Sequence, residues 1–247
     1  MADFILVHGG LHGGWCWDLL RPELERLGHK TFAMDMPVDR PGVLMDGYTK
    51  SVLDAVAGKA APDSYLVGHS MGGFVVPRVA AAMPKARVVF LCAGFAHTSE
   101  AERQENLGAI DSNLFFGHLV TDDQGRVTMT EESAREVFYH DVTPEQAKWA
   151  FSKLRPQWQE GYANVAPIAP YKDRIAGIVA CADDRIVLPE PHKRIARARF
   201  GIEPRMLPGG HSPFLSRPAD LAQALDDIVK AGSEVATRSD SPTAPRP

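Results

Sequence analysis

The chain has 247 residues, 45% of them hydrophobic and 23% charged, with a formal net charge of −4 at pH 7. This balance is typical of a soluble globular protein and excludes the strong basic surplus of a nucleic-acid-binding surface. No run approaches the roughly 20 apolar residues that span a bilayer, so we expect no membrane association. Three widely spaced cysteines predict neither a disulfide framework nor a metal cluster. An apolar run starts at Phe4, which leaves no room for a signal peptide and predicts a cytoplasmic protein.

Short apolar runs alternate with helix-like segments along most of the sequence. The runs typical of buried strands are residues 4–8, 30–35, 65–67, 87–92, 175–181 and 205–207. The segments typical of helices are residues 19–27, 48–56, 72–82, 190–198 and 218–231. This alternation predicts an α/β protein with a doubly wound, mainly parallel sheet. The functional site of such a sheet lies at the carboxyl ends of its strands.

Residues 96–171 interrupt the alternation. Their polar sequence carries scattered aromatic side chains and a plausible helix at 144–154, which Thr143 would cap. An insertion of this size between two strands predicts a small helical cap over the strand ends, although a second small domain with no role at the site fits the same pattern. The predicted division is therefore an α/β core at 1–95 and 172–232, a helical cap at 96–171, and a Ser/Thr/Pro-rich, disordered tail at 233–247.

The most informative stretch is Gly68-His69-Ser70-Met71-Gly72, which joins an apolar run to a helix-like segment. A Gly-x-Ser-x-Gly turn of this kind holds its serine in a strained conformation that exposes the hydroxyl. The flanking positions need glycine because a side chain there would collide with the neighbouring strand or helix. Ser70 is therefore the candidate nucleophile. A glycine-rich corner without any chemistry could carry the same five residues, so the assignment needs support from the rest of the chain.

A serine nucleophile needs an adjacent base, and the base needs a group that orients it. Among the nine histidines, His211 has the best position, because it follows the last predicted strand on a loop that can reach across the strand ends. The orienting acid should follow the preceding strand, where Asp183 and Asp184 are both candidates. Nucleophile, acid and base would then all lie at one edge of the sheet.

Acyl transfer also needs two donors that stabilise the negative charge on the attacked carbonyl oxygen. The amide of Met71 follows the nucleophile directly at the start of a helix and can supply one. The second should come from the glycine-rich loop after the first strand, where Gly10 has the right place. This loop does not have the Gly-x-Gly-x-x-Gly spacing of a dinucleotide-binding turn.

Together these motifs resemble the α/β-hydrolase superfamily, and more narrowly the branch of plant methylesterases, polyneuridine aldehyde esterase and hydroxynitrile lyases with their bacterial esterase relatives. The similar segments are 7–17, 27–31 with Asp35, 68–73, 184–189 and 209–211. The order nucleophile, acid, base along the chain is also that of the superfamily. The resemblance implies that Ser70, Asp184 and His211 form a catalytic triad, with Gly10 and Met71 as oxyanion donors. It also implies a small helical cap, no metal or organic cofactor and, in many members, a homodimer.

The expected function is hydrolysis of a carboxylic ester, with a small-to-medium hydrophobic molecule as substrate and an acyl-enzyme as intermediate. Two alternatives on the same fold stay open: a lyase similar to the hydroxynitrile lyases, and a ligand-binding receptor with little turnover. The hydroxynitrile lyases that the chain resembles carry a threonine and a lysine at the positions of Gly9 and Ser212. Their absence here favours hydrolysis.

Overall fold

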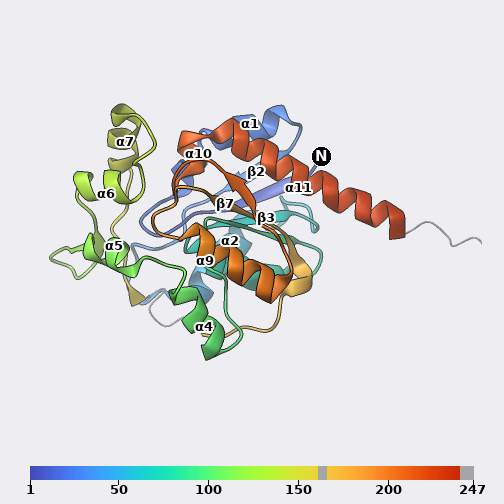
Figure 1. Ribbon diagram of the computed structural model, residues 1–247, viewed down its shortest axis with the longest axis horizontal. Helices are drawn as coiled ribbons and strands as arrows, with labels where there is room; N and C mark the ends of the chain where they lie inside the picture. Colours follow the sequence, from blue (N-terminus) through green and yellow to red (C-terminus); the bar gives the residue numbers. More distant parts are fainter. Residues whose placement is uncertain (161–165, 240–247) are drawn as a thin grey trace, which may run out of the picture.

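The structure, a computed structural model, describes residues 1–160 and 166–239 (Figure 1). Its centre is a six-stranded parallel sheet in the order β2-β1-β3-β4-β7-β8. The strands are β1 (Asp3–Val7), β2 (Lys30–Ala33), β3 (Tyr65–His69), β4 (Arg87–Leu91), β7 (Ile175–Cys181) and β8 (Arg205–Leu207). The first strand, β1, lies inside the sheet and β2 forms one edge. The later strands β3, β4, β7 and β8 follow in order on the other side of β1. The predicted fold class, a doubly wound parallel sheet, is confirmed.

Helices cover both faces of the sheet, because successive side chains of each strand point to opposite faces. Phe4 and Leu6 of β1 belong to one core cluster, whereas Ile5 and Val7 belong to the other. The first cluster includes residues of α1 (Leu20–Arg26) and α11 (Pro218–Ser239). The second includes residues of α2 (Met45–Val56), α3 (Gly72–Ala82) and α9 (Pro189–Ile195). Burial on both faces explains why these strands are continuous apolar runs.

Residues 96–171, which we call the cap segment, connect β4 to β7 and form short helices and a small hairpin. The elements are α4 (Glu100–Leu107), α5 (Ser112–Gly117), β5 (Val120–Thr121), β6 (Val127–Thr128), α6 (Glu131–Val137) and α7 (Pro144–Phe151). Helices α5, α6 and α7 lie together to one side of the sheet (Figure 1). Thr143 caps α7 as predicted, with its hydroxyl accepting a hydrogen bond from the Gln146 amide at 3.2 Å. The helix ends at Phe151, three residues earlier than predicted.

The last helix is longer than predicted, because α11 continues to Ser239. Residues 233–239, which the sequence analysis assigned to the tail, continue this helix, and no proline interrupts it before Pro242. Residues 240–247, the rest of the predicted tail, lie outside the described residues. Within the described parts of the chain, no helix combines the length and the apolar character that crossing a membrane requires.

Candidate active site

The turn between β3 and α3 has the geometry that its sequence predicts. The φ angle of Ser70 is +51°, in the left-handed region that residues with a side chain rarely adopt. A Cβ atom on Gly68 would lie 2.6 Å from the Gly72 carbonyl oxygen, and one on Gly72 would lie 2.5 Å from the Val7 carbonyl oxygen. The amide of Ser70 donates to the Leu91 carbonyl at 3.2 Å, so β4 helps to hold the turn. Strain of this kind typically costs about 1–3 kcal/mol and persists where the surroundings fix it.

His211 and Asp184 meet in the interior of the molecule. Nδ1 of His211 lies 2.9 Å from Oδ2 of Asp184, and both side chains are almost completely buried. The other carboxylate oxygen, Oδ1, accepts from the amides of Ile186 and Val187 at 2.9 and 3.0 Å. The carboxylate is therefore fixed by two amides from the turn after β7, and it orients the imidazole through the remaining oxygen.

His211 also contacts the serine turn. His69 donates from Nε2 to the His211 carbonyl oxygen at 2.9 Å, and the centroids of the two rings are 4.7 Å apart. Nε2 of His211 is buried and has no hydrogen-bond partner among the described residues. The ring is thus held next to the residue before Ser70, with one nitrogen unpaired. Burial is the main cause that lowers the pKa of His69 well below its ordinary value, so His69 stays neutral.

Two further carboxylates hold the loop in front of His211. Asp183 accepts from the Gly209 amide at 3.1 Å, and Asp141 of the cap segment accepts from the Gly210 amide at 2.7 Å. Gly209 has φ +94°, a conformation that glycine adopts without strain. Asp183 and Asp184, both candidates from the sequence, therefore have different contacts: Asp184 binds the His211 imidazole and Asp183 binds its backbone loop.

The predicted oxyanion donors lie on the two loops that meet at Ser70. Gly10 and Met71 line the same cavity as Ser70, and neither amide donates a hydrogen bond to another residue of the described chain. The loop after β1 passes close to the nucleophile, because a Cβ atom on Gly9 would lie 2.9 Å from Cβ of Ser70. All five predicted site residues thus come from loops at the carboxyl ends of β1, β3, β7 and β8.

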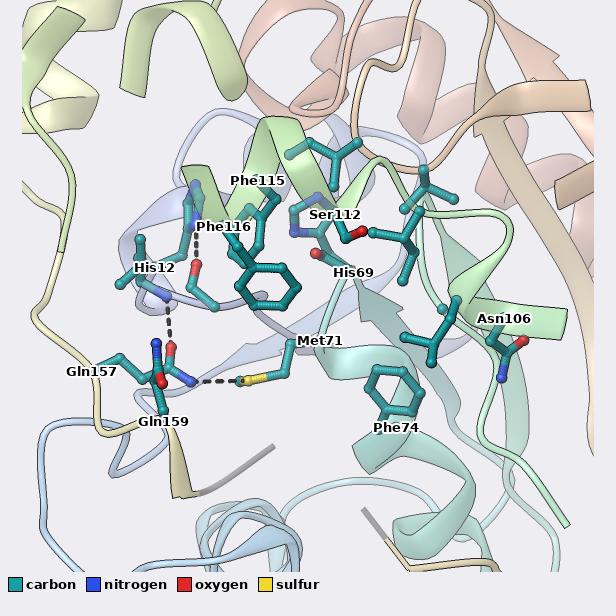
Figure 2. Close-up of a pocket in the computed structure, with 18 of the residues that line it drawn as sticks. His12, His69, Met71, Phe74, Asn106, Ser112, Phe115, Phe116, Gln157 and Gln159 are labelled. Carbon is teal, nitrogen blue, oxygen red and sulfur yellow. Dashed lines mark hydrogen bonds between the residues drawn. The ribbon is translucent and has the colours of Figure 1, made fainter. Parts of the chain in front are cut away.

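A cavity of about 320 Å³ opens above Ser70, between the strand ends and the cap segment (Figure 2). Its walls are mostly apolar and partly aromatic. The apolar side chains that line it are Leu11, Met71, Phe74, Leu107, Ile110, Phe115, Phe116, Phe138, Ile186 and Val187. Polar groups lie at a few points, among them Arg103 and Ser112 of the cap segment. A cavity of this size and lining fits a small hydrophobic molecule.

Residues 4–224 match the model of the alpha/beta hydrolase family. The chain belongs to the α/β-hydrolase family. This hydrolase is 28% identical over 255 residues to a pyrethroid hydrolase of Sphingobium wenxiniae, a match that covers 95% of this chain and 90% of the relative. It is 34% identical over 252 residues to a carbendazim hydrolyzing esterase of a Nocardioides species, covering 91% and 98% of the two chains. Since these relatives are named hydrolases and esterases, the predicted enzyme class, carboxylic ester hydrolase, is confirmed.

Solved structures give the same family and fold. The crystal structure of a pyrethroid hydrolase from Sphingobium faniae superposes with a TM-score of 0.73 at 25% identity, covering 94% of the hydrolase and 99% of that chain. Polyneuridine aldehyde esterase superposes with a TM-score of 0.76 at 21% identity, covering 93% and 99%. At that lower identity the likeness shows the fold alone.

Three residues at the active site of the hydrolase were missed by the sequence analysis. His12 lies buried behind the Gly10 loop, with Nδ1 2.8 Å from the Gly10 carbonyl oxygen and Nε2 2.9 Å from the Tyr139 hydroxyl. Gln157 is fully buried and contacts both Leu11 and Met71. The only sequence signal was the place of His12 in the glycine-rich motif, since Tyr139 and Gln157 belong to no pattern.

Proposed function

We propose that this hydrolase cleaves carboxylic esters through a covalent acyl-enzyme formed on Ser70. The Ser70 oxygen attacks the carbonyl carbon while Nε2 of His211 takes the hydroxyl proton, and the resulting oxyanion is stabilised by the Gly10 and Met71 amides. His211 then returns the proton to the departing alcohol. In the second half of the reaction, water attacks the acyl carbon while His211 takes its proton, and His211 returns that proton to the Ser70 oxygen as the acid leaves. Asp184 holds the imidazole in the tautomer that leaves Nε2 able to accept. No metal or organic cofactor takes part in this sequence.

The observation that carries the proposal is the buried Asp184–His211 pair beside a strained serine turn. Nδ1 of His211 faces the carboxylate at 2.9 Å, so Nδ1 carries the proton and Nε2 is the basic nitrogen. That nitrogen is the one without a partner in the described structure, and His211 contacts the residue next to Ser70. Hydrogen bonds between base and nucleophile are often absent or long before substrate binds.

We propose that the substrate is an ester with a hydrophobic, aromatic acyl or alcohol group. The support is the lining of the cavity, where aromatic rings such as Phe74, Phe115 and Phe138 surround the space above Ser70. The cap segment supplies many of these side chains, which supports its proposed role as a cap over the site. A cytoplasmic location and a homodimer remain proposals that rest on the sequence.

The loop next to Ser70 favours hydrolysis over the lyase alternative. The hydroxynitrile lyases that the sequence resembles have a threonine at the position of Gly9. Here a Cβ atom on Gly9 would come within 2.9 Å of Cβ of Ser70 and 2.8 Å of Nδ1 of His69, both tighter than real contacts. A threonine would not fit without moving these residues, whereas glycine leaves room for a carbonyl oxygen to reach the two amides.

Substitution of the nucleophile tests the proposal. We expect Ser70→Ala to abolish turnover of p-nitrophenyl acetate, because the covalent route needs the hydroxyl, while the thermal unfolding temperature stays close to that of the wild type. The wild type should react once per chain with an organophosphonate and turn over many esters per site. A Ser70→Ala protein that keeps a tenth of the wild-type kcat would contradict the proposal. So would a wild type that releases cyanide from mandelonitrile and leaves aryl esters intact.

A further inference from the structure

The cap segment reaches into the proposed oxyanion site through one buried side chain, Gln157. Its Oε1 accepts from the Leu11 amide at 2.8 Å, and its Nε2 donates to Sδ of Met71 at 3.1 Å (Figure 2). A Cβ atom on Gly10 would lie 3.3 Å from the same Oε1, so the amide also packs over Gly10. Gln157 therefore bonds to the peptide that follows one proposed oxyanion donor and to the side chain of the other.

The Gly10–Leu11 peptide is held from its other side by a second contact of the cap segment. His12 donates from Nδ1 to the Gly10 carbonyl at 2.8 Å, so its Nε2 accepts from the Tyr139 hydroxyl at 2.9 Å. Burial lowers the pKa of His12 to about 3, so the ring is neutral over the working pH range and this donor order is fixed. The carbonyl of the peptide is thus bound by the Tyr139–His12 chain and its N–H by Gln157.

His8 holds the start of the loop by donating from Nδ1 to the Gly9 carbonyl at 2.8 Å, but the two residues that follow Gly9 have backbone angles that need further support. Gly10 has no Cβ atom that restricts its φ and ψ angles, and Leu11 has φ +61°, which is unfavourable for a residue with a side chain. The preceding Gly9–Gly10 peptide carries the Gly10 N–H and is held by His8. Holding the Gly10–Leu11 peptide as well fixes both φ and ψ of Gly10, and thereby the position of this N–H. The Leu11 carbonyl is also bound, by the Arg155 amide at 2.7 Å.

We propose that Gln157 is a positioning residue of the active site, which orients the Gly10 and Met71 amides toward the developing oxyanion. It acts through the N–H of the Gly10–Leu11 peptide and through the Met71 side chain. The Tyr139–His12 pair holds the same peptide by its carbonyl oxygen. Donors fixed before the reaction need no reorganisation when the charge forms, which is the source of their effect on rate. The inference rests on the proposed function and adds that the cap segment tunes catalysis as well as covering the cavity.

The test is Gln157→Leu, which keeps much of the volume and removes both hydrogen bonds. A complete loss of one oxyanion donor costs about 10²–10³ in rate, and a misplaced donor costs less. We therefore expect kcat for p-nitrophenyl acetate to fall about ten- to a hundred-fold, with KM within about twofold of the wild type. A KM that rises while kcat stays constant would overturn the inference, because it would mean a contact with bound substrate.

Two ketone inhibitors, one that forms an oxyanion in the site and one that does not, distinguish the positioning of the oxyanion donors from a change in the shape of the cavity. The Ser70 oxygen adds to the carbonyl carbon of 2,2,2-trifluoroacetophenone, its proton passes to His211, and the ketone oxygen becomes an oxyanion in the proposed hole. In Gln157→Leu, the affinity for this ketone should fall by the same factor as kcat/KM. The affinity for acetophenone, which the enzyme binds without addition, should stay the same. Equal losses for both ketones would assign Gln157 to the shape of the cavity and overturn the inference.

Tyr139→Phe provides an independent variant, since it deletes only the hydroxyl that binds His12 and leaves the ring in place. It should lower kcat and the affinity for trifluoroacetophenone in parallel, by a smaller factor than Gln157→Leu does. If Gln157→Leu does not fold, Tyr139→Phe still tests whether contacts from the cap segment position the oxyanion donors. Gln124→Leu is the matched control, because Gln124 lies on the exposed turn between β5 and β6, away from the cavity. Wild-type kcat in both test variants, alongside an inactive Ser70→Ala, would overturn this inference alone. Wild-type turnover that persists in Ser70→Ala would instead overturn the proposed function.

Discussion

Asp183 and Asp184 are neighbours in sequence, but their carboxylates serve different parts of the site. Asp184 is bonded to Nδ1 of His211 and to two amides, with 4% of its surface exposed. Asp183 is exposed; its carboxylate accepts from the Gly209 amide through one oxygen, and its backbone amide donates to the Gly209 carbonyl. The spacing of the sequence alone left both residues as candidates for the orienting acid, and the contacts in the structure support Asp184.

Substitution of each aspartate by asparagine separates the two roles. In Asp184→Asn the amide nitrogen or oxygen faces His211, which favours the wrong tautomer and removes the charge that stabilises the imidazolium. We expect kcat for p-nitrophenyl acetate to fall by several orders of magnitude, about 10⁴ by analogy with serine proteases. In Asp183→Asn the amide oxygen can still accept from Gly209, so kcat should stay within about tenfold of the wild type. If steady-state kinetics showed the larger loss of kcat in Asp183→Asn, the orienting acid would be Asp183 and not Asp184.

The role of a residue can be predicted from the sequence when the residues that determine its conformation are its neighbours in the chain. Ser70 could be predicted because its strain, its glycines and its exposed hydroxyl are consequences of five consecutive residues. Gln157 could not, because its partners Leu11 and Met71 are 146 and 86 residues away and the contacts depend on how the cap segment packs. The roles of Ser70, Asp184, His211, Gly10 and Met71 in catalysis stay predictions.

At the scale of elements, the contact between the start of α3 and the end of β1 determines how close the turn lies to the sheet. Gly72 allows this approach, since a Cβ atom there would lie 2.5 Å from the Val7 carbonyl oxygen and 2.9 Å from that of His8. Both oxygens belong to the backbone, one in β1 and one in the buried residue that follows it, and neither can move aside as a flexible side chain could. The helix must therefore shift away from β1 if any side chain is present.

We expect Gly72→Ala to destabilise the protein by about 1–3 kcal/mol, as overpacking against a rigid backbone does. The matched control is Gly117→Ala at the end of α5, where a Cβ atom meets nothing within 4 Å. That variant should change stability by less than about 1 kcal/mol, because alanine has the better helix propensity. Urea unfolding followed by circular dichroism measures both values. Equal stabilities for the two variants would mean that the contact between α3 and β1 is looser than described.

The elements of the core were easier to predict than those of the cap segment, for a physical reason. The inner strands β1, β3, β4 and β7 are mostly buried on both faces, so their sequences must be largely apolar. Helices α4 and α5 are short and bury few side chains. The α4 sequence is mostly polar, and the six residues of α5 are too few to show a helical period. Helix α7 was predicted because Thr143, Pro144 and Gln146 form a local start signal that needs no tertiary contact.

At the scale of the whole molecule, several histidines are buried in neutral form, which links stability to pH. Burial is the main cause that lowers the pKa of His8 and His192 to about 4 and that of His12 to about 3. His8 accepts from the Met36 amide, and His192 donates to the Ala93 carbonyl and stacks on Phe95. Protonation of His8 removes the acceptor that binds the Met36 amide, whereas protonation of His192 is unfavourable because it buries a charge.

The sign of the effect follows from the direction of these pKa shifts. Near pH 5 the unfolded chain protonates each of these histidines, with a pKa of about 6.5, while the folded chain leaves them neutral. The unfolded state thus binds more protons, and the free energy of unfolding decreases as the pH falls from about 6.5 toward 4. Each histidine contributes a slope of up to about 1.4 kcal/mol per pH unit in this range. Few carboxylates titrate above pH 5, so the histidines dominate the upper part of it.

We therefore expect the free energy of unfolding, measured in urea between pH 7 and pH 5, to fall by several kcal/mol, a large part of the total for most domains. His192→Gln tests the cause, because His192 is not one of the proposed triad residues and glutamine can also donate to the Ala93 carbonyl. The variant should show a slope between pH 6 and pH 5 that is smaller by about 1 kcal/mol per pH unit, whatever its stability at pH 7. A wild type with constant stability over this range would contradict the buried neutral histidines. An unchanged slope in His192→Gln would show that His192 takes up its proton in the folded protein as readily as in the unfolded chain.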